Sequence, residues 1–173
     1  MSGKTHAVVG ANAVWVAALV YPLGNEVPVL LAIGALAALL PDIDATSAKI
    51  HYMGSGALGV FRGVFHHRGF FHSFLAISII AILTQLFLSS YHPALPMVMI
   101  LGYASHPIID GFNKPGVEYF FPWRKRIRLL PKWLTTPVNG VVDQLLFIAG
   151  VAGIVFLMTT YSDLFSVANV MLY

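Results

Sequence analysis

The side chains best suited to chemistry in this 173-residue chain are histidines and aspartates, and cysteine is absent. His106 and Asp110 are four residues apart, a spacing that places two side chains on the same face of a helix. Imidazole and carboxylate groups without thiolate suit divalent ions such as Zn²⁺, Mn²⁺, Fe²⁺ or Mg²⁺. The pattern predicts a site for one or two divalent metal ions, with zinc as the first choice.

Two more clusters carry the same side-chain types. Asp42 and Asp44 are two residues apart, so they share a face if the segment is extended. His67 and His72 flank a predicted turn that could aim both imidazoles inward. The predicted metal ligands are His6, Asp42, Asp44, His67, His72, His106 and Asp110.

The composition indicates that membrane helices position these residues. Hydrophobic residues make up 58% of the chain and charged residues 10%, whereas an ordinary globular chain carries about 25% charged residues. In lipid, an apolar segment must satisfy its own backbone hydrogen bonds, which predicts helices. The expected helices cover about 7–21, 27–40, 74–88, 94–109 and 145–160.

The predicted fold is therefore an all-α polytopic transmembrane bundle of four to five membrane helices, within a single domain covering 1–173. The second stretch, 27–40, is short enough to be a re-entrant or interfacial hairpin instead. Small residues predict close helix contacts, because they let backbones approach each other. They are Gly34, Ala35, Ala37, Ala38, Gly150 and Gly153.

Loop lengths and charges predict the orientation. Up-and-down helices place the two long loops, 41–73 and 111–144, on the same side of the membrane as the N-terminus. All ten Lys and Arg residues lie on that side, and Lys/Arg bias marks the cytoplasmic face. The stretch 123–134 mixes basic residues with Trp and Leu, which predicts contact with anionic lipid headgroups. A nucleic-acid partner is not expected.

Six of the seven histidines and four of the five aspartates lie on this cytoplasmic side. The candidate ligands either precede, open or close the first four predicted helices, so these helix ends converge at one depth; His6, for example, precedes the first helix. Each residue alone also fits an ordinary role, such as a cap, a turn or a headgroup contact. Asp143 fits the role of a cap for the last helix. The convergence favours a metal site for the set.

These residues fall within a series of motifs. They are Thr5-His6, Pro41-Asp42-Ile43-Asp44, His67-Arg68-Gly69-x-x-His72-Ser73, Gly102-Tyr103-x-Ser105-His106-x-x-x-Asp110 and Gly116-Val117-x-x-x-x-Pro122. In this order the chain resembles the YdjM-like family from about residue 5 to 123. The family is described as LexA-regulated inner-membrane proteins and predicted membrane-bound, metal-dependent hydrolases. The resemblance implies a bacterial inner-membrane hydrolase whose expression follows the SOS response.

A more distant similarity is to zinc-dependent phospholipase C and related nucleases. By that analogy His106 and Asp110 bind metal, Asp42 or Asp44 bridges two ions, and the histidines at 67 and 72 complete the set.

The expected function is hydrolysis of a phosphoester, in a phospholipid or another lipid phosphate, at the cytoplasmic membrane face. Asp44 and Arg68 are the predicted catalytic residues, and the Arg68 guanidinium suits bidentate binding of a phosphate. One alternative is a non-catalytic membrane scaffold with a structural metal site. Another is a transporter, which would need polar residues at mid-membrane depth. The sequence leaves the oligomeric state open.

Overall fold

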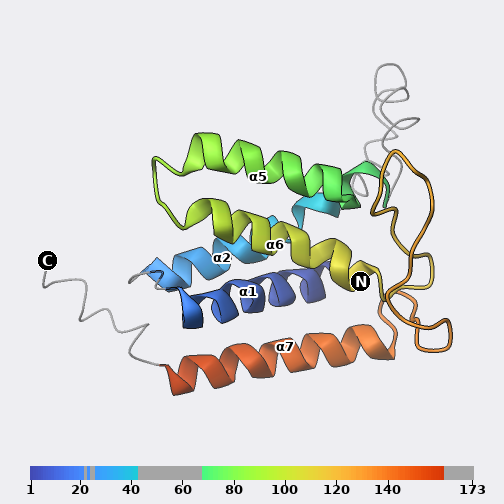
Figure 1. Ribbon diagram of the computed structural model, residues 1–173. Helices are drawn as coiled ribbons and strands as arrows, with labels where there is room; N and C mark the ends of the chain where they lie inside the picture. The colour runs from blue at the N-terminus through green and yellow to red at the C-terminus, as the bar shows by residue number, and fades with distance from the viewer. Residues whose placement is uncertain (22, 24–25, 43–67, 162–173) are drawn as a thin grey trace, which may run out of the picture.

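The computed structural model describes residues 1–21, 23, 26–42 and 68–161, and its regular elements are all helices (Figure 1). Within these residues there is no β-strand, which confirms the all-α class. The helices are α1 (Gly3–Val20), α2 (Val27–Ala37), α5 (Phe74–Leu88), α6 (Leu95–Asp110) and α7 (Val141–Thr160). Two short 3-10 helices, η2 (Leu40–Asp42) and η3 (Phe70–His72), accompany them.

Some helix ends differ from the expected ones. The expectation that His6 precedes the first helix is wrong, because α1 begins at Gly3 and His6 lies in its first turn. The backbone N–H groups of Thr5 and His6 both bond to the carbonyl of Ser2, so the helix starts before the apolar run. The second helix is shorter than expected and ends at Ala37.

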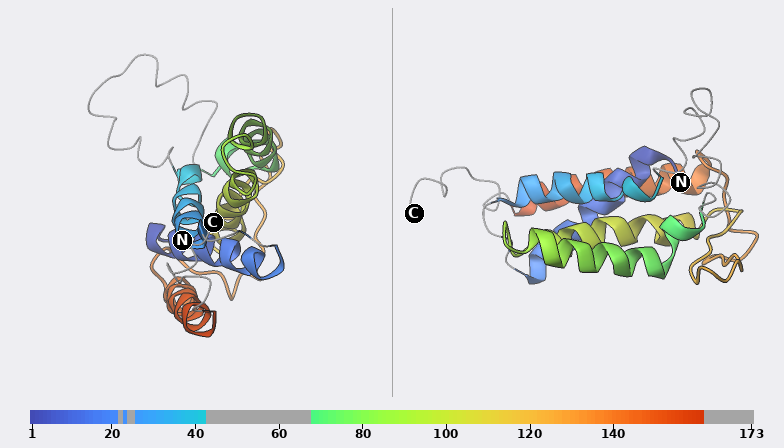
Figure 2. Two further views of the ribbon diagram at one scale, coloured as in Figure 1. Left: turned by 90° about the vertical axis from the view of Figure 1, so that its left-hand side faces the viewer. Right: turned by 90° about the horizontal axis from the view of Figure 1, so that it is seen from above.

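The helices lie side by side with α1 in the middle (Figures 1 and 2). On one side α1 packs against α7, and on the other against α2 and α6. Helix α5 covers the outer side of α6. The segment between α6 and α7 lies beyond one end of the bundle, the same end at which α1 begins (Figure 1).

Three glycines bring α1, α2 and α6 unusually close together. A Cβ atom on Gly10 of α1 would lie 2.7 Å from the carbonyl oxygen of Gly34 in α2. A Cβ on Gly102 of α6 would lie 2.8 Å from the Cβ of Ala37 and would collide with the Gly34 carbonyl. A larger side chain would therefore separate the helices, and the predicted role of Gly34 and Ala37 as contact residues is confirmed.

A second small-residue contact attaches α7 to α1. A Cβ on Gly150 would lie 2.5 Å from Cγ1 of Val8, and one on Gly153 would lie 2.8 Å from Oδ1 of Asn12. The Nδ2 group of Asn12 donates to the Gly150 carbonyl oxygen at 2.9 Å. The two helices thus combine close backbone approach with a polar contact, as is common between membrane helices.

The outer surface of the bundle is strongly apolar. Among the described residues, α7 is the one helix long and apolar enough to cross a membrane by itself, and almost none of it is buried. Helix α5 has 15 residues and exposes large apolar side chains such as Leu86 and Phe87. Apolar surface of this extent indicates contact with lipid or with other proteins.

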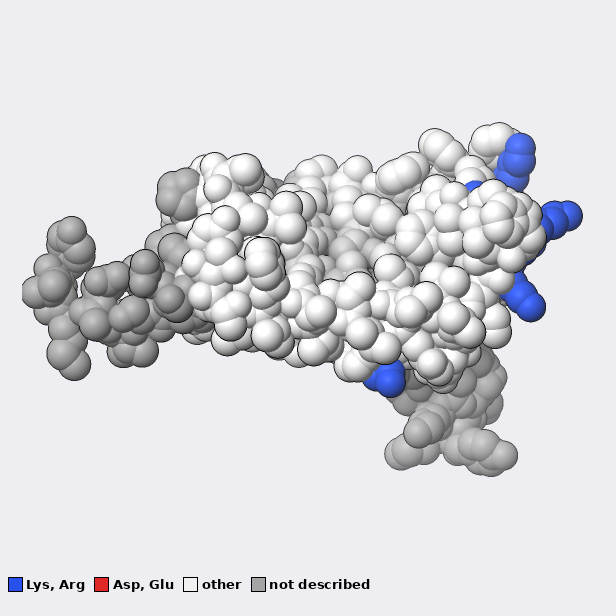
Figure 3. Space-filling model, turned by 90° about the horizontal axis from the view of Figure 1, so that it is seen from below, with Lys and Arg blue, Asp and Glu red and all other residues white. Residues whose placement is uncertain are grey.

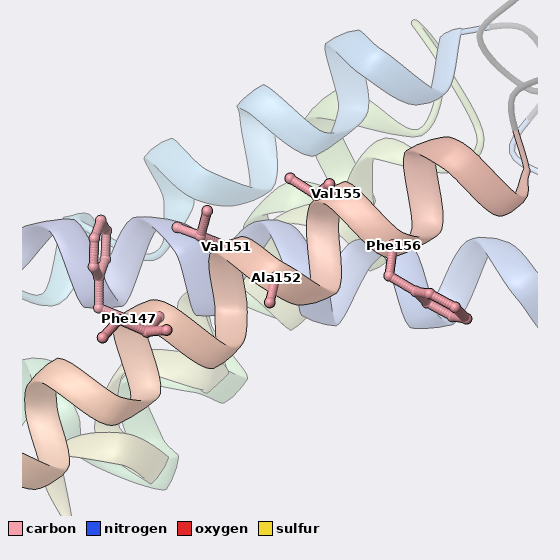
Figure 4. A pocket seen from close by; sticks show the side chains of 6 residues that line it. Phe147, Val151, Ala152, Val155 and Phe156 are labelled. Atoms are coloured by element: carbon pink, nitrogen blue, oxygen red, sulfur yellow. The ribbon is translucent and has the colours of Figure 1, made fainter.

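A shallow groove runs along α7 and is made entirely of apolar side chains (Figure 4). Its lining residues are Phe147, Ile148, Val151, Ala152, Val155 and Phe156. None of these side chains can ligate a metal or transfer a proton, so this groove is not a catalytic site.

Candidate metal centre

Five of the seven predicted ligands come together at the end of the bundle where α1 begins and α6 ends. Helix α1 supplies His6, η2 supplies Asp42, η3 supplies His72, and α6 supplies His106 and Asp110. Four of them are almost fully buried, whereas the Asp42 side chain is 30% exposed. Asp42 therefore marks the most open side of the cluster. The other two predicted ligands, at 44 and 67, lie outside the described residues.

Several ligand atoms in this cluster lie at distances that a single metal ion could bridge. The two Nε2 atoms of His72 and His106 are 3.1 Å apart. The nearest Asp42 oxygen lies 3.7 and 3.4 Å from them, and Oδ2 of Asp110 lies 3.7 and 3.9 Å from them. Ligands about 2.0–2.1 Å from a tetrahedral zinc ion are separated by about 3.3–3.4 Å. Groups of three among the described residues could thus hold a divalent ion.

The tautomer of His106 is fixed by the backbone. Its Nδ1 atom lies 2.6 Å from the carbonyl oxygen of Ala38. Because a carbonyl only accepts hydrogen bonds, Nδ1 carries the hydrogen and the Nε2 lone pair points toward the cluster. This arrangement of a histidine held by a carbonyl is typical of metal ligands.

His6 is the least satisfied member of the cluster. Its ring stacks on that of His106 with centroids 3.5 Å apart and planes 7° from parallel. Neither ring nitrogen has a hydrogen-bond partner among the described residues, although Nε2 lies 3.3 Å from Oδ1 of Asp110. Buried polar atoms are normally paired, so this imidazole fits a site that receives an additional group.

Asp110 is held by several donors. The Nδ2 group of Asn113 donates to its Oδ1 atom at 2.8 Å, and the amino group of Met1 contacts the same oxygen. The Arg68 Nε atom lies 2.8 Å from Oδ2. Arg68 itself is buried and has a φ of 64°, a left-handed conformation that is uncommon for a residue with a side chain. These contacts fix the carboxylate and balance its negative charge.

The short helix η3 places His72. The hydroxyl of Tyr103 in α6 donates to the carbonyl of Phe71 at 2.6 Å, which ties η3 to α6. The Ser73 hydroxyl accepts the N–H of Ala76 and caps α5. The motif residues beside the ligands therefore have identifiable structural roles.

Asp42 is ionised at the cluster's open side. Burial opposes its ionisation, but the neighbouring His106 and His72 imidazoles outweigh this effect and hold the pKa of the Asp42 carboxyl below its usual range. A carboxylate that is already deprotonated can bind a cation without first releasing a proton.

The described donors form groups of three that share one histidine. The residues form two overlapping triads, His6–Asp42–His106 and His72–His106–Asp110, and His106 belongs to both. A single Nε2 lone pair binds one ion, so the two triads cannot each hold an ion through His106. The described residues therefore favour one ion.

Sequence reasoning missed the groups that orient the ligands. Asn113 follows Asp110 by three residues and is fully buried, and its polar type so near the motif was the available signal. The Ala38 carbonyl is a backbone group, so no residue type in the sequence indicates it.

The prediction that Asp143 caps the last helix is wrong, because the N-cap of α7 is Gly140 and Asp143 lies within the first turn of the helix. Its carboxylate instead accepts the Asn139 N–H at 2.7 Å and the Thr5 hydroxyl.

Together these features define a class: an all-helical protein with an apolar exterior and a buried histidine–aspartate cluster that could hold a metal. A family model described as "YdjM inner membrane protein" matches residues 1–172. The chain belongs to this family, which indicates a bacterial inner-membrane protein.

Two curated relatives illustrate the family. The uncharacterized protein YvsG of Bacillus subtilis is 33% identical over 150 residues, covering 87% of this chain and 89% of YvsG. Inner membrane protein YdjM of Escherichia coli is 35% identical over 102 residues, covering 54% of this chain and 50% of YdjM. No solved structure matches the chain, and the similarity to zinc-dependent phospholipase C is not confirmed.

Proposed function

We propose that this protein is a multi-pass inner-membrane hydrolase that uses one divalent metal ion, preferably zinc, to cleave a phosphoester at the cytoplasmic face. The observation that carries the proposal is the spacing of four ligand atoms from three separate segments. These atoms lie 3.1–3.9 Å apart in the five pairs that join Asp42, His72, His106 and Asp110. His6 is the fifth side chain beside the same site.

A divalent ion in such a site supplies Lewis acidity and lowers the pKa of a bound water. The protein's own residues would do the rest. The Ala38 carbonyl and Asn113 keep His106 and Asp110 in binding orientation. Asp42, the most exposed ligand, lies where a substrate could approach. Asp44, which lies outside the described residues, remains a predicted catalytic residue.

Arg68 has two proposed roles. Its Nε atom already contacts Asp110, which favours a role in positioning that carboxylate. Its guanidinium carries further N–H donors that suit a phosphate oxygen. We propose that Arg68 keeps the Asp110 contact and presents the remaining donors to the phosphoester.

The membrane arrangement is part of the proposal. The apolar exteriors of α5 and α7 support several crossings, and the short helices are compatible with a locally thin bilayer. A 15-residue helix rises about 22 Å, against about 30 Å of hydrocarbon. The basic residues at the end of the bundle that holds the cluster favour a cytoplasmic site.

The test is a hydrolysis assay on the full chain purified with native lipid. Phospholipids and isoprenoid phosphates are offered to metal-loaded protein, to chelated protein and to protein reloaded with Zn²⁺ or Mn²⁺. The proposal expects hydrolysis of one phosphoester bond, seen as release of phosphate from a monoester or of an alcohol and a phosphomonoester from a phospholipid. Chelation should stop this reaction, metal should restore it, and Asp110→Asn should not catalyse it. Stoichiometric metal without any hydrolysis across the panel would instead identify a structural metal site.

A further inference from the structure

The segment that connects α6 to α7 forms a compact basic surface, which we call the basic platform (residues 111–134). It contains six basic residues and one acidic residue, Glu118. Glu118 is buried and lies 3.3 Å from Nε of Arg126. The exposed part of the platform is therefore entirely positive. The six basic residues are Lys114, Arg124, Lys125, Arg126, Arg128 and Lys132, all exposed.

The platform also exposes large apolar side chains between its charges. Trp123 is 61% exposed and Trp133 is 81% exposed. Leu129 and Leu134 are exposed beside them, and the Lys125 ammonium lies 5.4 Å from the centre of the Trp123 ring. A segment that combines indole rings with basic side chains is typical of one that lies in the headgroup region of a bilayer.

The platform is an ordered surface. The backbones of Val117 and Ile127 exchange two hydrogen bonds of 3.0 and 2.9 Å. The N–H of Leu129 bonds to the Gly111 carbonyl at 2.9 Å. These bonds hold the backbone that carries the exposed charges.

The same segment is fastened to the metal cluster. The N–H of Glu118 donates to the carbonyl of Arg68, whose side chain contacts Asp110. The hydroxyl of Tyr119 donates to the carbonyl of Pro107 at 2.8 Å, between the two ligands of α6. Burial and the nearby Asp110 charge raise the pKa of Tyr119 well above its usual value, so this donor keeps its proton.

The platform lies where the apolar helices end. In the ribbon view it follows α6 and precedes α7 beyond one end of the bundle (Figure 1). On the face seen from below, the blue Lys and Arg side chains gather toward that end (Figure 3). Helix α7 is long and apolar enough to cross a bilayer, and in that arrangement its first residues and the platform before them lie near the lipid–water boundary.

We infer that the basic platform binds anionic phospholipid headgroups of the membrane in which the protein sits. Charge complementarity, the exposed indoles and the position at the helix ends all favour this partner. Nucleic acid would match the charge but would not account for exposed Leu129 and Leu134. The inference concerns a binding surface and does not depend on whether the metal cluster is catalytic.

The test uses the full chain in nanodiscs of phosphatidylcholine alone or of phosphatidylcholine mixed with phosphatidylglycerol. The readout is emission of the exposed indoles, taken as wild type minus the Trp123→Phe/Trp133→Phe variant, since the third Trp is buried. Phosphatidylglycerol should shift this emission to the blue and protect it from acrylamide. High salt should weaken the shift, because 1 M salt shortens the Debye length from about 10 Å to about 3 Å.

Two matched variants distinguish a loss of positive charge from a loss of folding. Arg124→Gln/Lys125→Gln/Lys132→Gln should weaken the response to phosphatidylglycerol titrated into detergent micelles by about fivefold for each charge removed. Arg124→Lys/Lys125→Arg/Lys132→Arg should retain it. Both should keep the thermal midpoint and bound metal of wild type, so a failure here is distinguishable from a failure of the metal site. If the neutral variant does not fold, Lys125→Gln alone should weaken the response to phosphatidylglycerol by about fivefold.

Identical emission in the two kinds of nanodisc would overturn the inference. So would a neutral variant that responds to phosphatidylglycerol like wild type. A single-stranded oligonucleotide that shifts the same indoles at lower concentration than phosphatidylglycerol would assign the platform to nucleic acid instead.

Discussion

The Nδ1 atom of His106 in α6 lies 2.6 Å from the carbonyl oxygen of Ala38, just after α2. This bond is available because Gly102, one turn earlier in α6, packs directly on Gly34 and Ala37. A glycine four residues from a ligand, in the opposite direction along the chain, recurs in α1, where Gly10 follows His6. A Cβ on Gly10 would lie 2.5 Å from the Cβ of Ala38. The glycine crossing therefore determines how closely the ligand-bearing helix ends meet.

Replacing Gly102 by Val should weaken metal binding without touching a ligand. Its Cβ would collide with the Gly34 carbonyl, so α6 must move away from α2 and His106 must lose its acceptor. Overpacking of this kind costs about 1–3 kcal/mol. Both the thermal midpoint and the zinc affinity should fall. The matched control is Gly3→Ala, whose Cβ would meet Leu39 at an ordinary 3.8 Å and should change neither.

Asn113→Ala should lower zinc affinity by about 10–100-fold, as is usual when a group that orients a ligand is removed. The side chain donates to Oδ1 of Asp110, and without it the carboxylate can rotate. Competition with a fluorescent chelator measures the change. Ser89→Ala, at a half-buried site whose side chain bonds the Gln85 carbonyl of its own helix, serves as the control. Equal affinities would show that Asn113 does not orient Asp110.

Arg68→Lys should keep the metal and slow turnover. A lysine ammonium can still pair with Asp110, but it lacks the planar fork that suits a phosphate. A hundredfold lower rate, or about 2.7 kcal/mol, would fit an electrostatic role in the transition state. Metal content and kcat are measured on the same preparation. Loss of metal together with rate would assign Arg68 to positioning of Asp110 alone.

Single introduced cysteines should report the orientation of the protein, because the natural chain contains none. Tyr91 is 82% exposed at the turn between α5 and α6, and Tyr91→Cys should react with an impermeant maleimide added outside intact cells. Lys125→Cys, on the basic platform, should react only after the membrane is opened. Labelling of Lys125→Cys in intact cells would place the cluster on the outer side.

For five of the seven predicted ligands the sequence identified side chains that meet, since charges and loop lengths assigned four helix ends to one membrane face. His6, Asp42, His72, His106 and Asp110 do lie together. Their role as ligands is still a prediction. The hydrogen bond that orients His106 could not be predicted from the sequence. Its acceptor is the backbone carbonyl of Ala38, which can be identified only once the helix packing is known.

The turn that contains Arg68 shows the same limit. The neighbouring glycine predicted a turn, but the inward direction of the guanidinium depends on its left-handed backbone and on the position of Asp110 in another helix. Helix starts were missed for a simpler reason. The first turn of α1 is polar and is stabilised by bonds to Ser2 and Asp143, which apolar periodicity does not reveal.

The most direct test of the central claim is the metal content of protein purified in native lipid, measured by mass spectrometry on matched histidine variants. Wild type and His92→Ala should each retain about one divalent ion per chain, because His92 lies near Glu26 at the opposite end of the bundle. His106→Ala and Asp110→Asn should lose that ion. Equal metal content in all four proteins, or none in wild type after purification in zinc, would contradict the site.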